Sequence, residues 1–135
     1  MFLDTVDEAD AETIIEYLTD STAKLRAAQL RVLGGAVARV PASATAYAHR
    51  ARRIMVNLAA LHDGGTDAAR HEAWVDAFLR ALRNGQPGAY VNFLVDDGPS
   101  RMHEAYPNGT WERLRAIKSR YDPANLFRLN QNIAP

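Results

Sequence analysis

The sequence predicts an α+β fold in which an antiparallel β-sheet has α-helices packed on one face. Helix-like and strand-like stretches follow one another in the order helix, strands, helix, strand, helix, and the early connections are short enough for hairpins. The chain has 135 residues, of which 47% are hydrophobic and 24% charged, a composition typical of a globular protein. We therefore expect residues 1–135 to form a single domain.

The first helix is predicted over residues 10–22. Ile14, Ile15 and Leu18 recur at steps of one, three and four residues, and Leu25 continues the series. Acidic residues cluster near the start, where the helix dipole favours negative charge. This pattern predicts an amphipathic helix whose apolar residues face the core.

Two strands are predicted next. Residues 29–40, "QLRVLGGAVARV", form a β-prone run in which the adjacent Gly34 and Gly35 suggest a bulge or a close approach of another surface. A short extended piece follows at residues 45–50, "TAYAHR", and a second long strand at residues 52–61.

Two further helices are predicted, over residues 67–84 and 110–121. In the first of these, Trp74, Phe78 and Leu82 lie on one stripe. In the second, four residues are expected to point inward: Trp111, Leu114, Ile117 and Tyr121. Asp122 is expected to cap a further turn that begins with Pro123.

Residues 89–95 are predicted to form a buried strand with an unusual face. Alternate residues of a strand share a face, so Tyr90 and Asn92 would be neighbours where Val or Ile would pack better. A second unusual feature is the "NQN" of residues 130–132, which lies in a tail that would be expected to fray. Its amides either fasten the tail to the backbone or offer donors and acceptors to a ligand.

Composition narrows the functional classes. The net charge is zero, so the chain as a whole has no electrostatic attraction to nucleic acid or to an anionic membrane. There is no cysteine, and the four histidines do not have the spacing of a metal site. His62 and His71 flank a Gly-rich loop and are expected to be solvated. No signal peptide and no apolar run of about 18 residues is visible, which predicts a soluble cytoplasmic protein.

The C-terminal third carries a specific resemblance. "AYVNFLVDD" followed by "AYPNGTWERLRAIKSRYDPANLFRLNQNIAP" resembles the C-terminal signature of the berberine-bridge-enzyme-like FAD-linked oxidoreductases. That signature is a Tyr-x-Asn strand, a helix with Arg-Leu and Lys, then Tyr-Asp-Pro-x-Asn-x-Phe and a closing amide-rich segment. The resemblance covers roughly residues 12–135, and residues 88–135 are its specific part.

The resemblance implies a cofactor, FAD, and roles for individual residues. Tyr90 corresponds to a catalytic, substrate-facing base, and Asn92 to a residue that helps hold the flavin. Two tail amides, Asn130 and Asn132, correspond to residues near the flavin domain, so all three asparagines are predicted to be cofactor-binding. The alignment places Asn57 where plant members carry a catalytic glutamate, and an amide cannot take up a proton at neutral pH.

The resemblance also implies that something is missing. In that family the FAD domain, with its phosphate-binding loops and its covalent tethers to the flavin, precedes this region, and 135 residues leave no room for it. A free phenol has a pKa of about 10, so a tyrosine base needs a positive neighbour or another activating group. The chain alone is expected to hold FAD weakly and to be a poor oxidase.

Three hypotheses follow. The chain is the C-terminal portion or split half of an FAD-linked oxidoreductase acting on a small organic molecule, with an FAD-domain polypeptide as partner. Alternatively, it is a freestanding flavin-free protein of secondary metabolism that binds or cyclises a small molecule, using Asn57 and His49 as substrate-binding groups beside Tyr90. The third hypothesis is a dimerisation or partner-binding domain, in which a homodimer covers the sheet face.

Overall fold

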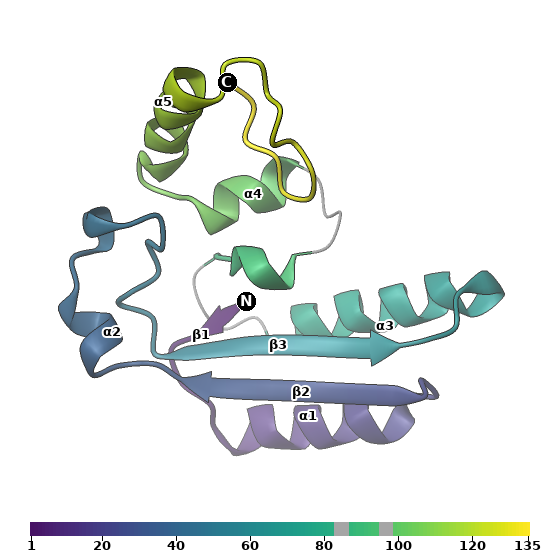
Figure 1. Cartoon of the computed structure of the whole chain (residues 1–135). Coiled ribbons are helices and arrows are strands. Elements are labelled where there is room, and N and C mark those ends of the chain that lie inside the picture. Colours follow the sequence, from purple (N-terminus) through teal and green to yellow (C-terminus); the bar gives the residue numbers. More distant parts are fainter. Residues whose placement is uncertain (83–86, 95–98) are drawn as a thin grey trace. The chain divides into compact units, whose positions relative to one another are not determined.

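The computed structural model describes residues 1–82, 87–94 and 99–135 (Figure 1). The chain divides into two compact units. The first, called the sheet unit, comprises residues 1–33 and 52–86, and the second, the tail unit, comprises residues 34–51 and 87–135. None of the helices that the structure describes is long and apolar enough to cross a membrane.

The sheet unit contains three strands: β1 (Phe2–Leu3), β2 (Leu25–Val32) and β3 (Ile54–Leu61). Their order is β1-β3-β2, and both pairings are antiparallel. The register places Gln29 of β2 opposite Asn57 of β3. The prediction of an antiparallel sheet is confirmed, and so is the strand predicted at residues 52–61.

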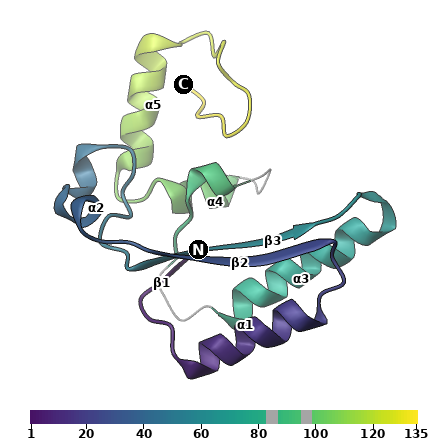
Figure 2. The same ribbon diagram turned by 60° about the horizontal axis from the view of Figure 1, so that its bottom comes forward.

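Helices α1 (Glu8–Asp20) and α3 (Ala68–Ala81) lie side by side on one face of this sheet (Figures 1 and 2). α1 begins with a capping box, in which Asp7 Oδ1 accepts from the Asp10 amide at 3.0 Å and Asp10 Oδ2 accepts from the Asp7 amide at 3.1 Å. The two helices are linked because the indole N–H of Trp74 donates to the Tyr17 carbonyl at 3.1 Å. Helices on one face of an antiparallel sheet confirm the predicted α+β class.

The core of the sheet unit lies between the helices and the sheet. Its buried side chains are Leu3, Val56, Leu58, Phe78 and Leu82. The stripe predicted on the second helix is therefore confirmed. Two other predictions are wrong, because Ile15 is 65% exposed and Leu25 is 52% exposed. Successive residues of a helix point about 100° apart, so when α1 packs Ile14 against the core, the adjacent Ile15 is left exposed.

The strand predicted at residues 29–40 is wrong in its second half. β2 ends at Val32, and Gly34 and Gly35 lie outside the strand with φ angles of +150° and +53°. Glycine adopts these backbone angles without a steric penalty, which lets the chain turn into the short helix α2 (Ala36–Arg39). The pair therefore marks the end of a strand and not a bulge within one. The extended piece predicted at residues 45–50 is not a strand, and the 3₁₀-helix η1 (Ala42–Ala44) precedes it.

The tail unit continues with the 3₁₀-helix η3 (Val91–Phe93), α4 (Pro99–Ala105) and α5 (Thr110–Tyr121). α5 confirms the predicted helix, whereas α4 has only seven residues and was not predicted. The strand predicted over residues 89–95 is wrong. Tyr90 is extended, and the chain then tightens into η3, with the Phe93 amide donating to the Tyr90 carbonyl at 2.9 Å. The last residue of that predicted strand, Val95, and the last of the predicted helix 67–84, Asn84, lie outside the described residues.

The tail unit has a small core. Its buried residues are Ala89, Leu94, Met102 and Ala105, against which Trp111 and Ile133 pack. The inward prediction for α5 fails at Ile117, which is 45% exposed, and at Tyr121, which is 72% exposed, because this cluster meets only the first turn of the helix.

After α5 the carboxylate of Asp122 caps the next turn. It accepts from the Leu126 amide at 2.8 Å and from the Phe127 amide at 3.0 Å, and it forms an ion pair with Lys118. The predicted capping role of Asp122 is confirmed, although the segment it caps is a turn and not a helix. The tail then returns to α5, where Arg115 Nη2 donates to the Pro135 carbonyl at 3.3 Å.

Candidate functional site

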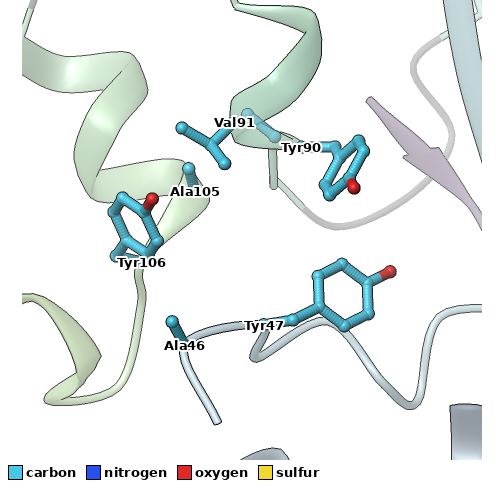
Figure 3. A pocket seen from close by; sticks show the side chains of 7 residues that line it. Ala46, Tyr47, Tyr90, Val91, Ala105 and Tyr106 are labelled. Atoms are coloured by element: carbon cyan, nitrogen blue, oxygen red, sulfur yellow. The ribbon is translucent and has the colours of Figure 1, made fainter. Parts of the chain in front are cut away.

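A hollow of about 160 Å³ lies within the tail unit (Figure 3). The residues that line it come from three separate stretches of chain and share a simple chemistry, because all are tyrosine or a small aliphatic residue. They are Ala46, Tyr47, Ala89, Tyr90, Val91, Ala105 and Tyr106. Three of the five tyrosines of the protein therefore face one small space.

Each tyrosine is held by a different local structure. Tyr47 lies on the loop between η1 and β3, Tyr90 immediately precedes η3, and Tyr106 follows the last residue of α4. Figure 3 shows the rings of Tyr47 and Tyr90 as neighbours with their hydroxyl groups directed to the same side, while Tyr106 lies across the hollow. An alanine precedes each of the three, and its small side chain leaves the space beside the ring open.

Edge-to-face contacts fix the rings around Tyr90. The Tyr47 and Tyr90 centroids are 5.8 Å apart with the ring planes at 89°, and the Tyr90 and Phe93 centroids are 5.3 Å apart with the planes at 79°. His49, which is buried, meets Tyr47 edge-on at 6.0 Å. These are the favoured geometries for aromatic pairs, and they preorganise the wall of the hollow.

Tyr90 and Asn92 are joined by a hydrogen bond. Asn92 Nδ2 donates to the Tyr90 phenol oxygen at 2.8 Å. The expectation that these two side chains are neighbours therefore holds, although these residues do not form the strand from which it was argued. Asn92 lies in the 3₁₀-helix η3, which begins directly after Tyr90, and this tight turn brings the Asn92 amide back to the Tyr90 phenol.

The charge near the hollow comes from Arg50. Its guanidinium lies 5.5 Å from the centroid of the Tyr47 ring, and it is held by Thr45 Oγ1 at 2.8 Å and the Val37 carbonyl at 3.3 Å. Burial raises the pKa of Tyr47, the neighbouring Tyr90 raises it further, and Arg50 lowers it in part. Burial also raises the pKa of Tyr106, so both phenols stay neutral at neutral pH.

The predicted tail amides lie in a turn. Asn130 has a positive φ of +58°, and its carbonyl accepts from the Asn132 amide at 2.9 Å. Between them, Gln131 Nε2 donates to the Leu94 carbonyl at 2.6 Å and so fastens the tail to the segment that follows Tyr90. The amide-rich segment thus makes the backbone contact that one of the two sequence interpretations anticipated.

Asn57 lies in the sheet unit, whereas Tyr90 lies in the tail unit. On β3 it stands opposite Gln29. Met55, Asn57 and Ala59 alternate with the core residues Val56 and Leu58, which places Asn57 on the sheet face that points away from the helices.

The prediction that His62 and His71 are solvated is wrong for His71, which is buried near the start of α3. Its ring stacks on that of His62 at 5.6 Å, and His62 Nδ1 accepts from the Gly64 amide at 3.1 Å. The loop before α3 folds back over the helix and covers this side chain. No group of three or more potential metal ligands occurs among residues 1–82, 87–94 and 99–135.

Sequence reasoning missed Tyr47 and Tyr106 as site residues. Neither belongs to a periodic segment, and the loops that carry them have no recognisable pattern. One signal was available, because the dipeptide Ala-Tyr occurs three times in the chain, at residues 46–47, 89–90 and 105–106, and all six residues line the hollow.

Comparison with known proteins shows which protein family the segment that carries Tyr90 and Asn92 resembles. Residues 89–134 match the family model "Berberine and berberine like", a span that includes Tyr90, Asn92 and the tail amides. Residues 89–134 of this chain belong to the berberine and berberine-like family, which confirms the resemblance seen in the sequence. The family model therefore matches the segment in which the sequence resemblance was most specific.

Individual relatives match 76% and 93% of this chain, and a solved structure matches 99% of it. An FAD-linked oxidoreductase, sorD, of Penicillium rubens is 33% identical over 93% of this chain and 28% of its own length. YvdP of Bacillus subtilis, an uncharacterized FAD-linked oxidoreductase, is 31% identical over 76% of this chain and 23% of its own length. The structure of a glycopeptide hexose oxidase in complex with teicoplanin shares the fold, with a TM-score of 0.80 and 24% identity over 99% of this chain and 31% of that one. The berberine-bridge-like chain thus spans less than a third of each of these proteins.

The tyrosine-lined hollow does not fit FAD. Pockets that enclose drug-sized ligands measure roughly 300–1,000 Å³, and FAD is larger than most drugs, whereas this hollow measures about 160 Å³. The amide of Asn92, which the resemblance assigns to the flavin, is engaged by the Tyr90 phenol. The hollow has room for one small ring and not for the cofactor.

Proposed function

We propose that the chain supplies the C-terminal part of the substrate domain and the berberine-like segment of an FAD-linked oxidoreductase that acts on a small organic molecule. Most of the contacts that hold the FAD come from residues other than these 135, in the same polypeptide or in a partner, and Asn92, Asn130 and Asn132 contribute from this chain. The observation that carries this proposal is the hydrogen-bonded Tyr90–Asn92 pair, which lies within the matched segment and borders a hollow of molecular size. The FAD-linked relatives support the reaction class.

In this proposal Tyr90 is the catalytic residue: after its own phenol proton has passed to solvent, the phenolate oxygen receives a proton from the substrate. Asn92 Nδ2 donates to the Tyr90 phenol oxygen and so fixes the direction in which the remaining lone pair of that oxygen points. Asn92 therefore acts on the reaction through Tyr90, in addition to any contact with the flavin.

The other predicted residues have supporting roles. Asn130 and Asn132 lie in the turn held by Gln131, where they are proposed to face the FAD-binding part of the enzyme. His49 contacts the Tyr47 ring edge-on, and Asn57 offers an amide on the sheet face opposite the helices. Organisation of residues 1–135 as a single domain stays a prediction.

The experiment is isolation of the protein from its own source with an antibody against this chain, followed by flavin analysis and a screen for substrate-dependent hydrogen peroxide or acceptor reduction. We expect flavin to co-purify with the chain. In the active preparation, Tyr90→Phe should lower kcat by roughly 100-fold, the usual worth of a positioned proton acceptor. The matched control is Tyr121→Phe, which removes the same hydroxyl from an exposed residue of the same unit and should leave kcat unchanged. Native protein without flavin, or full activity in Tyr90→Phe, would overturn the proposal.

A second candidate is a flavin-free protein that binds a small metabolite. It is favoured by one observation: the hollow is lined by residues of the tail unit of this chain. Native protein that lacks flavin but carries a bound small molecule would support it. Homodimerisation also stays a prediction, and light scattering of the purified chain tests it directly.

A further inference from the structure

We propose that the tyrosine-lined hollow binds one neutral aromatic ring that carries a hydroxyl group, such as a phenol or a benzylic alcohol. This inference deepens the proposed function, on which it rests for the statement that the ring belongs to the substrate. The binding itself depends only on the tail unit. Size, polarity and ring geometry each point to this ligand class.

Size favours a single ring. A cavity of roughly 150 Å³ lined by apolar side chains holds one benzene molecule. The hollow measures about 160 Å³, so it accommodates one six-membered ring with a short substituent. Ala46, Ala89 and Ala105 set this limit, because any larger side chain at these positions would occupy the space beside a tyrosine.

The polarity of the lining favours a neutral ligand. Among the described residues, no charged side chain lines the hollow, and its polar side-chain groups are the three phenol hydroxyls. Burial raises the pKa of both Tyr47 and Tyr106, so these two present neutral O–H groups at neutral pH. A charged ligand would lose its hydration shell without gaining a partner of opposite charge.

Ring geometry favours an aromatic ligand over an aliphatic one. Tyr47 and Tyr90 are already perpendicular, so the hollow offers a ring face and a ring edge in fixed positions. An aromatic ligand has an electron-rich face and an electron-poor edge and can complement both, whereas a saturated ring of the same size can pack its C–H groups on a ring face but has no electron-rich face to meet a ring edge. In Figure 3 the hydroxyl groups of Tyr47 and Tyr90 lie on the side of their rings away from Tyr106, so a ligand hydroxyl would meet them at that end of the hollow.

A sugar ring fits the same volume less well. A pyranose carries several hydroxyl groups, and each one that is buried without a partner costs free energy. Three phenols cannot satisfy them in a wall that otherwise consists of alanine and valine side chains. The preferred ligand therefore has one hydroxyl group or two, on a flat ring.

The test uses the purified chain with ring-labelled tyrosine and four probes: p-cresol, benzyl alcohol, cyclohexanol and glucose. Ring signals are assigned with single Tyr→Phe variants. We expect p-cresol and benzyl alcohol to shift the signals of Tyr47, Tyr90 and Tyr106 saturably, with dissociation constants in the millimolar range. Tyr17, which stacks on Phe78 in the sheet unit, is an internal control whose signal should not move. Cyclohexanol should bind about five-fold more weakly, in keeping with the worth of an aromatic pair, and glucose should give no saturable shift.

Two variants provide a matched pair. Ala46→Leu places a larger side chain at the hollow from an exposed loop position, and Ala44→Leu makes the same change two residues earlier, at an exposed position that does not line the hollow. Ala46→Leu should weaken p-cresol binding at least ten-fold, and Ala44→Leu should leave it unchanged. Equal binding of p-cresol by both variants, equal binding of cyclohexanol and p-cresol, or tighter binding of glucose would overturn the inference.

The outcomes also separate this inference from the proposed function. Saturable ring binding by a protein that carries no flavin in its native source supports the hollow and refutes the oxidoreductase proposal. Flavin-dependent turnover that depends on Tyr90, in a chain whose tyrosine signals no aromatic probe shifts, refutes the hollow and leaves the oxidoreductase proposal standing.

Discussion

The sheet unit and the tail unit are held together in different ways. The sheet unit buries large side chains, Phe2, Leu3, Val56, Phe78 and Leu82, between two regular helices and a three-stranded sheet. The core of the tail unit is much smaller in volume, since two of its four buried residues are alanine. Bulk apolar burial therefore stabilises the first unit, and the second unit requires other contacts.

Those other contacts are polar and join distant parts of the chain. Arg113 Nη1 donates to the Ser43 carbonyl at 2.7 Å across 70 residues, and Gln131 Nε2 donates to the Leu94 carbonyl across 37. Irregular backbone held at a few points by such bonds can place side chains where no helix or strand would put them. The tyrosine-lined hollow is an example, and it lies in this unit.

The largest expected effect tests the apolar side of this comparison with a matched pair of phenylalanines. Phe78→Ala should lower the free energy of unfolding by about 3–5 kcal/mol, because it empties a fully buried site in the sheet unit. Phe127→Ala removes the same atoms from a side chain that is 84% exposed in the tail unit and should change it by less than about 0.5 kcal/mol. Urea unfolding followed by circular dichroism gives both values. Similar losses for the two variants would show that the tail unit depends on apolar burial as much as the sheet unit does.

The same contrast explains how far the sequence was informative. The periodicity of apolar residues predicts β3, α3 and α5 because those elements repeat at 2 or 3.6 residues and pack one face. It fails at residues 89–95, where "AYVNFLV" alternates like a strand but residues 91–93 adopt a 3₁₀ turn. Local propensity cannot register the contact that decides this, which is the fastening of Leu94 by Gln131 from the far end of the chain.

The residues of the candidate site also differ in whether they could be predicted from the sequence. Tyr90 and Asn92 could be found from sequence because they share a short motif and lie two residues apart. Tyr47 and Tyr106 could not, because what brings them to Tyr90 is the folding of the loop at residues 42–50 against the end of α4, a long-range arrangement with no periodic signature. The repeated Ala-Tyr dipeptide was visible, but its meaning depends on three loops meeting.

An intermediate effect tests the polar side of the comparison with two glutamines. Gln131→Leu should cost about 1 kcal/mol, because the partly buried carbonyl of Leu94 loses its hydrogen-bond donor. Gln29→Leu changes an exposed position of β2 and should be close to neutral. Hydrogen exchange followed by mass spectrometry should show faster exchange over residues 87–94 and 128–135 in Gln131→Leu only. Unchanged exchange in that variant would mean that the tail is held by apolar contacts such as that of Ile133.

The smallest expected effect is local and depends on pH. The hydrogen bond from Lys118 lowers the pKa of the Asp122 carboxyl below its ordinary value, and the amides of Leu126 and Phe127 lower it further. Because the pKa is lower in the folded state than in the unfolded state, the ionised carboxylate stabilises the turn fully above the unfolded pKa of about 4, and this stabilisation is lost as the pH falls through the folded pKa. The amide signals of Leu126 and Phe127 should therefore be constant from pH 7 to about 4 and change only below that. In Lys118→Met the largest cause of the shift is removed, so the change should begin at a higher pH, and in Asp122→Asn it should be absent. If Lys118→Met and the natural chain gave the same transition, the Lys118 side chain would not stabilise the turn. The polar side-chain contacts of the tail unit would then contribute less to its stability than the comparison with the sheet unit implies.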